Sequence, residues 1–189
     1  MAILESEKME KEAVEMGASM MALSARTAPK ARGMDSIKTL VLTGADLERL
    51  AVAMEKKVKE KSIELPTFKR DADSVRNSAA VLLIGVSRNP KRVEVPLNCG
   101  GCGYRSCKDL LAAGKREGED FTGPACIFQA IDLGIALGSA VKVAGELSID
   151  NRMMFTAGSA AKKLNLLDSD LIIGIPLSAT GKNPYFDRP

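Results

Sequence analysis

Three of the four cysteines in the chain lie close together in a loop made largely of glycine. The segment "VPLNCGGCGYRSCKDLL" contains Cys99, Cys102 and Cys107, and Cys126 follows in "GPAC", which gives the spacing C-x2-C-x4-C-x18-C. Four unrelated cysteines would spread over the 189 residues, yet the rest of the chain contains none. A free cysteine is often only a small buried apolar residue. The clustering instead indicates a metal site.

Two kinds of metal site compete for these thiols. Structural zinc usually takes two separated CxxC pairs, whereas three close cysteines with one remote partner are the arrangement of iron–sulfur proteins. Gly100, Gly101 and Gly103 would let the backbone wrap a cluster without a Cβ clash and would free amides to point at sulfur. The order is not the plant-type spacing of two-iron clusters. The spacing therefore favours an iron–sulfur cluster, and zinc stays as the alternative.

Composition narrows the remaining classes of function. The chain has no histidine, which excludes Ser-His-Asp and Cys-His catalysis and mixed Cys/His zinc sites. The net charge is +3 with basic and acidic residues interleaved, and aromatic residues make up 4%, so we expect no nucleic-acid partner. The charged start "MAILESEKMEKEAVEM" does not resemble a secretion signal, which predicts a cytoplasmic protein and disfavours disulfides. No residue is singled out as catalytic.

Hydrophobic periodicity predicts one domain of mixed α and β elements over residues 1–189. The first helix presents a face of small residues and methionines, among them Ala13, Val14, Gly17 and Met20, that we expect to pack. The next helix opens with a capping-box pattern at Thr43. We expect helices over 4–25, 43–61, 106–118, 125–145 and 154–167, and strands over 37–42, 79–87 and 170–178.

The helix expected over 125–145 is apolar nearly all round and long enough to span a bilayer. Gln129, Asp132 and Lys142 interrupt it, so a helix in a protein core fits better, and we expect no membrane partner. A buried Asp132 needs a partner, which we expect to be a backbone group or a lysine. One small domain would struggle to cover the segment from Ile127 to Ala144 on all sides, which is consistent with a homodimer.

The cysteine segment "CGGCGYRSC" resembles the C-G-x-C-G-x3-C signature of small four-iron ferredoxin-like domains of electron-transfer proteins. The resemblance covers residues 99 to 126. It implies that Cys99, Cys102, Cys107 and Cys126 ligate a 4Fe–4S cluster, which would transfer electrons or be kept for sensing or structure.

Other segments resemble flavin-dependent nitroreductases, among them "ALSARTAPKARGMDSIKTLVLTGADLERLA" and "AIDLGIALGSAVKVAG". The whole chain is similar to the prokaryotic family of ferredoxin-domain-containing proteins, nitroreductase-like with an inserted cysteine loop. The resemblance implies an α+β sandwich with a central mixed or antiparallel sheet flanked by helices, in which residues 95–126 are the inserted loop. It also implies a homodimer with FMN at the subunit interface.

The chain lacks the Arg-x-Ser-x-Arg segment with which nitroreductases hold the FMN phosphate, and it has no tryptophan. Lys30 and Arg32 are the candidates to replace those arginines, with Lys182 or Arg188 from a tail that crosses to the partner subunit. The alternative is that Lys30 and Arg32 are solvated charges on a loop, and that the tail is a terminal arm that only packs.

The leading hypothesis is an electron-transfer protein with a 4Fe–4S cluster on a nitroreductase-like homodimer. It would exchange electrons with a flavin or with a redox protein partner. An FMN-dependent oxidoreductase activity stays open. The alternative is a non-catalytic iron–sulfur or zinc module for protein interaction or redox sensing.

Overall fold

A four-stranded antiparallel sheet forms the centre of the computed structural model, which describes residue 3 and residues 5–186. The strands are β1 (Lys38–Thr43), β2 (Ala80–Val86), β5 (Asp150–Asn151) and β6 (Leu171–Ser178), in the order β1-β2-β6-β5. Every residue of β2 is buried, because helices cover both faces of this central strand. The prediction of a central sheet flanked by helices is confirmed, and all its strand pairs are antiparallel.

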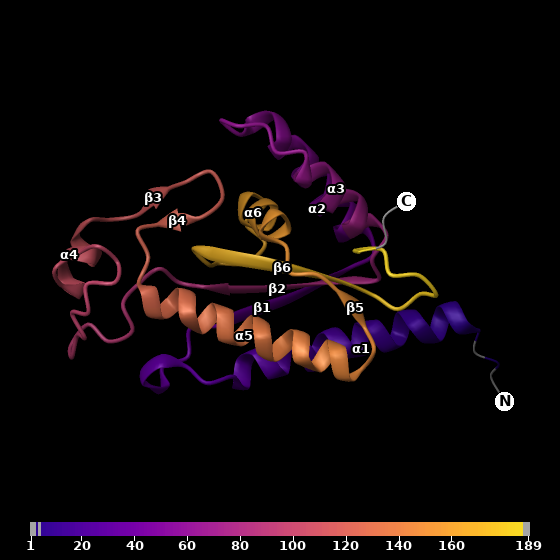
Figure 1. Cartoon of the computed structure of the whole chain (residues 1–189), viewed down its shortest axis with the longest axis horizontal. Helices are drawn as coiled ribbons and strands as arrows, with labels where there is room; N and C mark the ends of the chain where they lie inside the picture. Colours follow the sequence, from indigo (N-terminus) through magenta and orange to yellow (C-terminus); the bar gives the residue numbers. More distant parts are fainter. Residues whose placement is uncertain (1–2, 4, 187–189) are drawn as a thin grey trace.

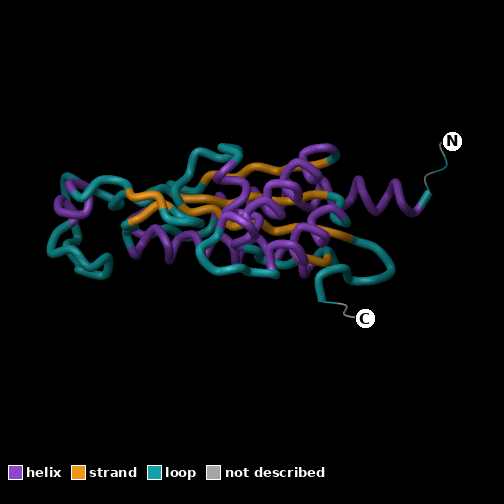
Figure 2. Tube along the Cα trace, turned by 90° about the horizontal axis from the view of Figure 1, so that it is seen from above, coloured by secondary structure: helices purple, strands orange, loops and turns teal. Residues whose placement is uncertain are grey.

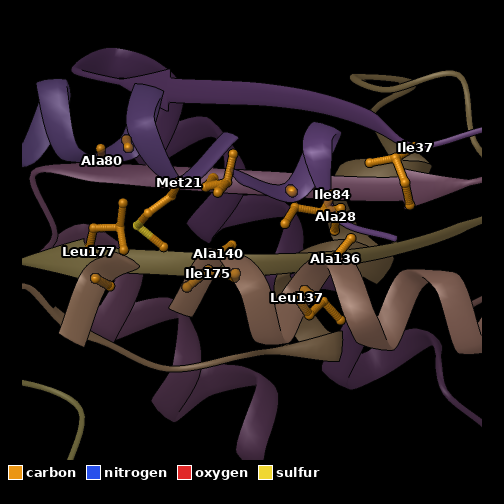
Figure 3. Close-up of a cluster of buried hydrophobic side chains, with 14 of the residues drawn as sticks. Met21, Ala28, Ile37, Ala80, Ile84, Ala136, Leu137, Ala140, Ile175 and Leu177 are labelled. Carbon is orange, nitrogen blue, oxygen red and sulfur yellow. The ribbon is translucent and has the colours of Figure 1, made fainter. Parts of the chain in front are cut away.

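Two layers of helices enclose the sheet (Figure 1). On one face lie α1 (Ser6–Thr27) and α5 (Ile127–Glu146), and on the other lie α2 (Ala45–Glu60), α3 (Thr67–Arg76) and α6 (Phe155–Lys163). Alternate residues of β2 feed separate cores, since Leu82 and Ile84 pack with α1 and α5 whereas Val81 and Leu83 face α2 and α6. Figure 3 shows the first core, where Met21 of α1 and Ala140 of α5 meet the sheet.

The predicted helices and strands over most of the chain are present, with several differences of detail. The helix predicted over 106–118 ends at Ala112, and residues 116–117 pair in a small hairpin instead. The helix predicted over 154–167 ends at Lys163. The face of α1 that packs is formed by Val14, Gly17, Ala18, Met21 and Ala25, whereas Ala13 and Met20 are exposed. The capping box predicted at Thr43 is wrong, because Thr43 still pairs in β1 and Gly44 is the N-cap of α2 without a side-chain cap. The helix α3 was not predicted. The predicted first residue of α1, Leu4, lies outside the described residues, as does Arg188.

The cysteine segment lies between β2 and α5 and forms one end of the elongated molecule (Figures 1 and 2). It contains the short helix α4 (Cys107–Ala112) and a small hairpin of β3 (Arg116–Glu117) and β4 (Thr122–Gly123). A 3-10 turn, η1 (Ala31–Gly33), follows α1.

Helix α5 is the one described helix that is long and apolar enough to cross a membrane by length and composition. Its inner side packs on α1 and β2 through Leu133, Ala136 and Ala140. Its outer side carries a stripe at four-residue spacing, Ile127, Ile131 and Ile135, with 38–45% of each side chain exposed. The expectation that one domain cannot cover this helix on all sides agrees with that exposed stripe.

Candidate metal centre

Three of the four cysteines line one cavity at the end of the sheet. Cys99 is exposed, Cys107 is half-buried and Cys126 is buried, and all three border the cavity. The other lining residues are basic or apolar: Arg32, Lys91, Arg92, Leu97 and Phe128. The enclosed part measures about 20 Å³, room for about one water molecule, and the space reaches about 260 Å³ with its mouth open to solvent. A larger group would therefore lie at the mouth, beside Cys99.

Left-handed backbone conformations fold the first part of the loop back on itself. Gly100 (φ 74°) and Gly103 (φ 83°) adopt the region that glycine tolerates best, and the Gly103 amide donates to the Gly100 carbonyl at 2.9 Å. Asn98 is also left-handed, and its Oδ1 accepts a hydrogen bond from the Cys107 amide at 2.9 Å. The segment before Cys99 is thus bound directly to the start of α4, which brings two of the thiols to one side.

A capping box fixes where α4 begins. The Ser106 Oγ accepts from the Asp109 amide and the Asp109 carboxylate accepts from the Ser106 amide, both at 3.1 Å. Cys107 is therefore the first residue of the helix. This motif is legible in "SCKD" but was not part of the sequence prediction.

The fourth cysteine is held at the junction of α5 and the end of β2. Cys126 is the N-cap residue of α5, and its amide donates to the Arg88 carbonyl at 2.9 Å. Arg88 is buried and donates from Nη1 to the Pro124 carbonyl at 2.8 Å. A Cβ on Gly101 would lie 2.7 Å from Ile127, so only glycine lets the loop lie this close to the first turn of α5.

A buried ion pair joins the base of the loop to α5. The Lys91 Nζ lies 2.5 Å from the Asp132 carboxylate, and the two side chains are 3% and 1% exposed. The same carboxylate accepts from the Ala31 amide at 2.9 Å. The expectation that Asp132 has a backbone or lysine partner is confirmed, and the structure supplies both.

Further hydrogen bonds extend this pair into a network. Lys91 also donates to the Met34 carbonyl and to the Ser36 hydroxyl, at 3.1 and 2.8 Å. Ser36 in turn donates to the Gln129 side chain, whose amide nitrogen donates to the Asn89 carbonyl at 2.8 Å. The network ties three segments together: the turn after α1, the start of the cysteine segment and the first turns of α5.

The hairpin end of the cysteine segment is tied to the opposite layer. Asp120 lies 3.5 Å from Lys57 of α2 and 2.5 Å from Lys61, the residue that follows this helix. It also accepts a hydrogen bond from the Ser159 hydroxyl of α6 at 2.7 Å. Burial opposes ionisation of Asp120, but the hydrogen bonds from Lys61 and Ser159 outweigh it and lower its pKa. The segment is therefore anchored at both ends, and the cysteines lie between the anchors.

The donor set can be tested against both metals. Among the described residues, no three Cys, Asp or Glu side chains converge closely enough to hold one ion. Tetrahedral zinc bonds of about 2.3 Å require thiolate sulfurs only about 3.8 Å apart. In a cubane each thiolate binds a different iron, so the four sulfurs stand farther apart. Three thiols around one open cavity lined by cations, with the half-buried Cys102 on the same loop but outside the cavity lining, fit a cluster better than a single zinc ion.

The structure does not bring the three predicted flavin contacts together within one chain. Lys30 is buried in its own turn, with its Nζ donating to the Arg26 carbonyl and lying 3.7 Å from Asp35. Arg32 lines the cysteine cavity instead. Lys182 is exposed in the segment after β6, which lies at the other end of the sheet from the cysteine loop (Figure 1).

Comparison with known proteins identifies the family. A protein of Archaeoglobus fulgidus described as "Uncharacterized protein" is 47% identical over 186 residues, which cover 98% of this chain and 97% of its own. Residues 122–188 match a family model described as "Uncharacterized protein containing a ferredoxin domain (DUF2148)". The chain belongs to this family. The residues of this chain that match the family model, 122–188, include Cys126 but not the other three cysteines.

Solved structures of low sequence identity share the fold. An oxidoreductase containing FMN superposes with a TM-score of 0.54 at 13% identity, over 96% of this chain and 70% of its own. Nitroreductase A from Vibrio parahaemolyticus superposes with a TM-score of 0.53 at 11% identity, over 100% of this chain and 64% of its own. This member of the ferredoxin-domain family therefore has a nitroreductase-like fold, as expected from its sequence.

The network around Asp132 gives a prediction about stability. We expect Asp132→Asn to lower the free energy of unfolding by about 3–5 kcal/mol, because it leaves the Lys91 ammonium buried without its counterion. The double variant Lys91→Met, Asp132→Asn should recover part of this loss. Urea denaturation measures all three.

The matched control is Glu146→Gln, since Glu146 pairs with Lys142 on the same helix but both side chains are more than half exposed. Its cost should stay below about 1 kcal/mol. Equal costs for the Asp132 and Glu146 variants would contradict a special role for the buried pair.

Proposed function

We propose that this protein transfers electrons through a 4Fe–4S cluster held by Cys99, Cys102, Cys107 and Cys126. The observation that carries the proposal is that three of these cysteines line one cavity together with three cationic side chains. Such a group, when bound, supplies one-electron transfer. The proposal treats residues 1–189 as one cytoplasmic domain, with residues 95–126 as its inserted loop.

The side chains around the cavity suit this role. Arg32, Lys91 and Arg92 bring cationic side chains to the cavity, and cations there would offset part of the negative charge of a cluster with four thiolate ligands. Cys126 is 7% exposed and closes the inner end from water, whereas Cys99 is exposed at the mouth. A redox protein partner would therefore approach from the side of Cys99.

The first prediction is the metal content. Protein prepared without oxygen should hold about four iron and four sulfide per chain. Iron, acid-labile sulfide and zinc are measured on the same sample. Stoichiometric zinc without iron would instead support the alternative, a zinc module for protein interaction or sensing.

Single Cys→Ser variants serve as the control for the ligand assignment. Each of the four should lose most of its iron while the fold, followed by circular dichroism, is retained. A variant that keeps the full iron content would remove that cysteine from the ligand set.

We also propose that the protein is a homodimer through the outer face of α1 and α5. These two helices lie side by side on one face of the sheet (Figure 1). Besides the stripe on α5, the exposed side of α1 carries Met16, Met20 and Leu23, which are 48–65% exposed. Adjacent apolar side chains on two neighbouring helices are typical of a protein interface, and a second copy would cover them.

A dimer on this face should be broken by charge. The double variant Ile131→Glu, Ile135→Glu should be monomeric at micromolar concentration, because association would bury unpaired carboxylates. The control is Ile63→Glu, an isoleucine that is 71% exposed in the connection after α2 and outside the proposed face. Light scattering after size exclusion separates the outcomes, and a monomeric parent or an unchanged double variant would contradict the proposal.

A second candidate function is an FMN-dependent oxidoreductase. It is supported by the fold shared with an oxidoreductase that contains FMN. A flavin phosphate site made of Lys30, Arg32 and Lys182 would have to combine residues of two subunits, because the segment after β6, to which Lys182 belongs, lies at the other end of the sheet from the cysteine loop. The tail of one subunit would then supply its lysine to the other.

Titration with FMN tests this candidate. It predicts about one FMN per chain at saturation and at least about tenfold weaker binding by Lys182→Ala, since the phosphate loses a cation. The Lys30→Ala, Arg32→Ala double variant is measured beside it. No FMN uptake by the parent would contradict the oxidoreductase and leave the electron carrier. Equal affinity of the parent and both variants would show that the phosphate lies elsewhere.

A further inference from the structure

Arg32 occupies a backbone conformation that an arginine adopts at a cost. Its φ and ψ are 60° and 17°, in the left-handed region, and Gly33 follows with φ 66°. Such a conformation costs a residue with a Cβ about 1 kcal/mol or more, and glycine or asparagine would adopt it more readily. Side-chain interactions must therefore offset this cost.

The guanidinium group reaches across to the cysteine segment. Its Nη1 donates a hydrogen bond to the Val95 carbonyl, four residues before Cys99, and the side chain lines the cavity shared with Cys99, Cys107 and Cys126. The turn that carries Arg32 is itself fixed, because the Ala31 amide donates to the buried Asp132. The backbone before Arg32 is thus fixed to α5, and its guanidinium group binds the cysteine segment.

The three cations at the cavity differ in how far their charge is neutralised. Lys91 forms the buried ion pair with Asp132, so its charge is compensated at contact distance. Arg92 is exposed, where solvent screens its charge. Arg32 is only partly exposed, its identified partner is a neutral carbonyl, and no ion pair with a described carboxylate is found for it. It is therefore the least compensated partly buried charge beside the thiols.

We propose that Arg32 belongs to the cysteine site rather than to a flavin phosphate: its guanidinium holds the Val95 segment against the cavity, and its charge favours the reduced state of the cluster. This inference rests on the proposed function. A cubane with four thiolate ligands carries a net negative charge. One electron received from a donor protein increases that negative charge by one, and no bond is formed or broken. A fixed cation beside it stabilises the reduced state more than the oxidised one and raises the reduction potential.

The test compares Arg32→Gln, Arg32→Lys and the control Arg26→Gln. Arg26 lies six residues before Arg32, in the last turn of α1, and carries the same charge, but it is half exposed and pairs with Asp35. The first measurement is limited proteolysis of the full chain at Glu94, in the holo form and after metal removal. We expect Arg32→Gln to be cleaved about tenfold faster than the parent, since a charge-assisted hydrogen bond contributes about that factor to loop closure. Arg26→Gln should be cleaved at the rate of the parent.

The second measurement is a redox titration followed by electron paramagnetic resonance. Arg32→Gln should shift the midpoint potential to more negative values, whereas Arg32→Lys should stay near the parent because it keeps the charge. Arg26→Gln should leave the potential unchanged. Equal potentials and equal cleavage rates in Arg32→Gln and the parent would overturn the inference, as would equal shifts in the Arg32 and Arg26 variants.

The outcomes separate this inference from the function on which it rests. A parent without an iron–sulfur centre would overturn the proposed function and the electrostatic role together. Proteolysis would then decide the loop-holding role by itself. If the parent holds a normal cluster, and Arg32→Gln has the same midpoint potential and the same cleavage rate as the parent, the inference is overturned and the proposed function stays intact.

Discussion

An ammonium group and a carboxylate can be buried in an apolar interior only as partners, and in this protein that constraint decides where the cysteine loop begins. Asp132 lies on the inner side of α5, a helix with few other polar groups, and its charge needs a counterion. Lys91 supplies it from the start of the cysteine segment, and the Ala31 amide supplies a hydrogen bond from the turn after α1. The Lys91 segment cannot shift without leaving a buried charge unpaired, which is among the most costly defects a core can have. A shift of the turn after α1 would remove a hydrogen bond from the same buried carboxylate.

The first turns of α5 therefore act as the platform of the whole site. Cys126 begins the helix, Gln129 and Asp132 bind the neighbouring loops, and Ile127 supports the loop at Gly101. The opposite end of the segment is tied down by Asp120 through Lys57 and Lys61 on the other layer. A flexible loop would have to lose its freedom each time it bound a metal. A loop fixed at both ends has already lost most of that freedom on folding.

Much of the fold was predictable, because its strands and long helices have strong patterns. The fully apolar run of β2 marked a strand covered on both faces, and the need of Asp132 for a partner followed from its place in an apolar helix. Other features were harder to see. Helix α3 is short and rich in charge, although Phe68, Ala72 and Val75 have helical spacing and are buried. The pattern at Thr43 resembled a cap, but pairing in β1 overrides it.

The site itself was predictable only in part, since spacing along the chain reveals ligands close in sequence but not contacts made by folding. The cysteines were identified from their clustering alone. Arg32 was assigned to a flavin phosphate on the basis of a family resemblance, and the structure places it at the cysteine cavity, where it meets Val95. Lys91 has no sequence signal that sets it apart from the other lysines. Its role emerges only once the fold places it next to Asp132.

Anomalous diffraction from crystals grown without oxygen tests the central claim most directly, because it locates the metal as well as identifying it. Data collected at the iron and zinc absorption edges should show a compact group of iron peaks at the mouth of the cavity, within bonding distance of Cys99, Cys102, Cys107 and Cys126. A single zinc peak at the cysteines, or an iron signal elsewhere in the molecule, would contradict the account.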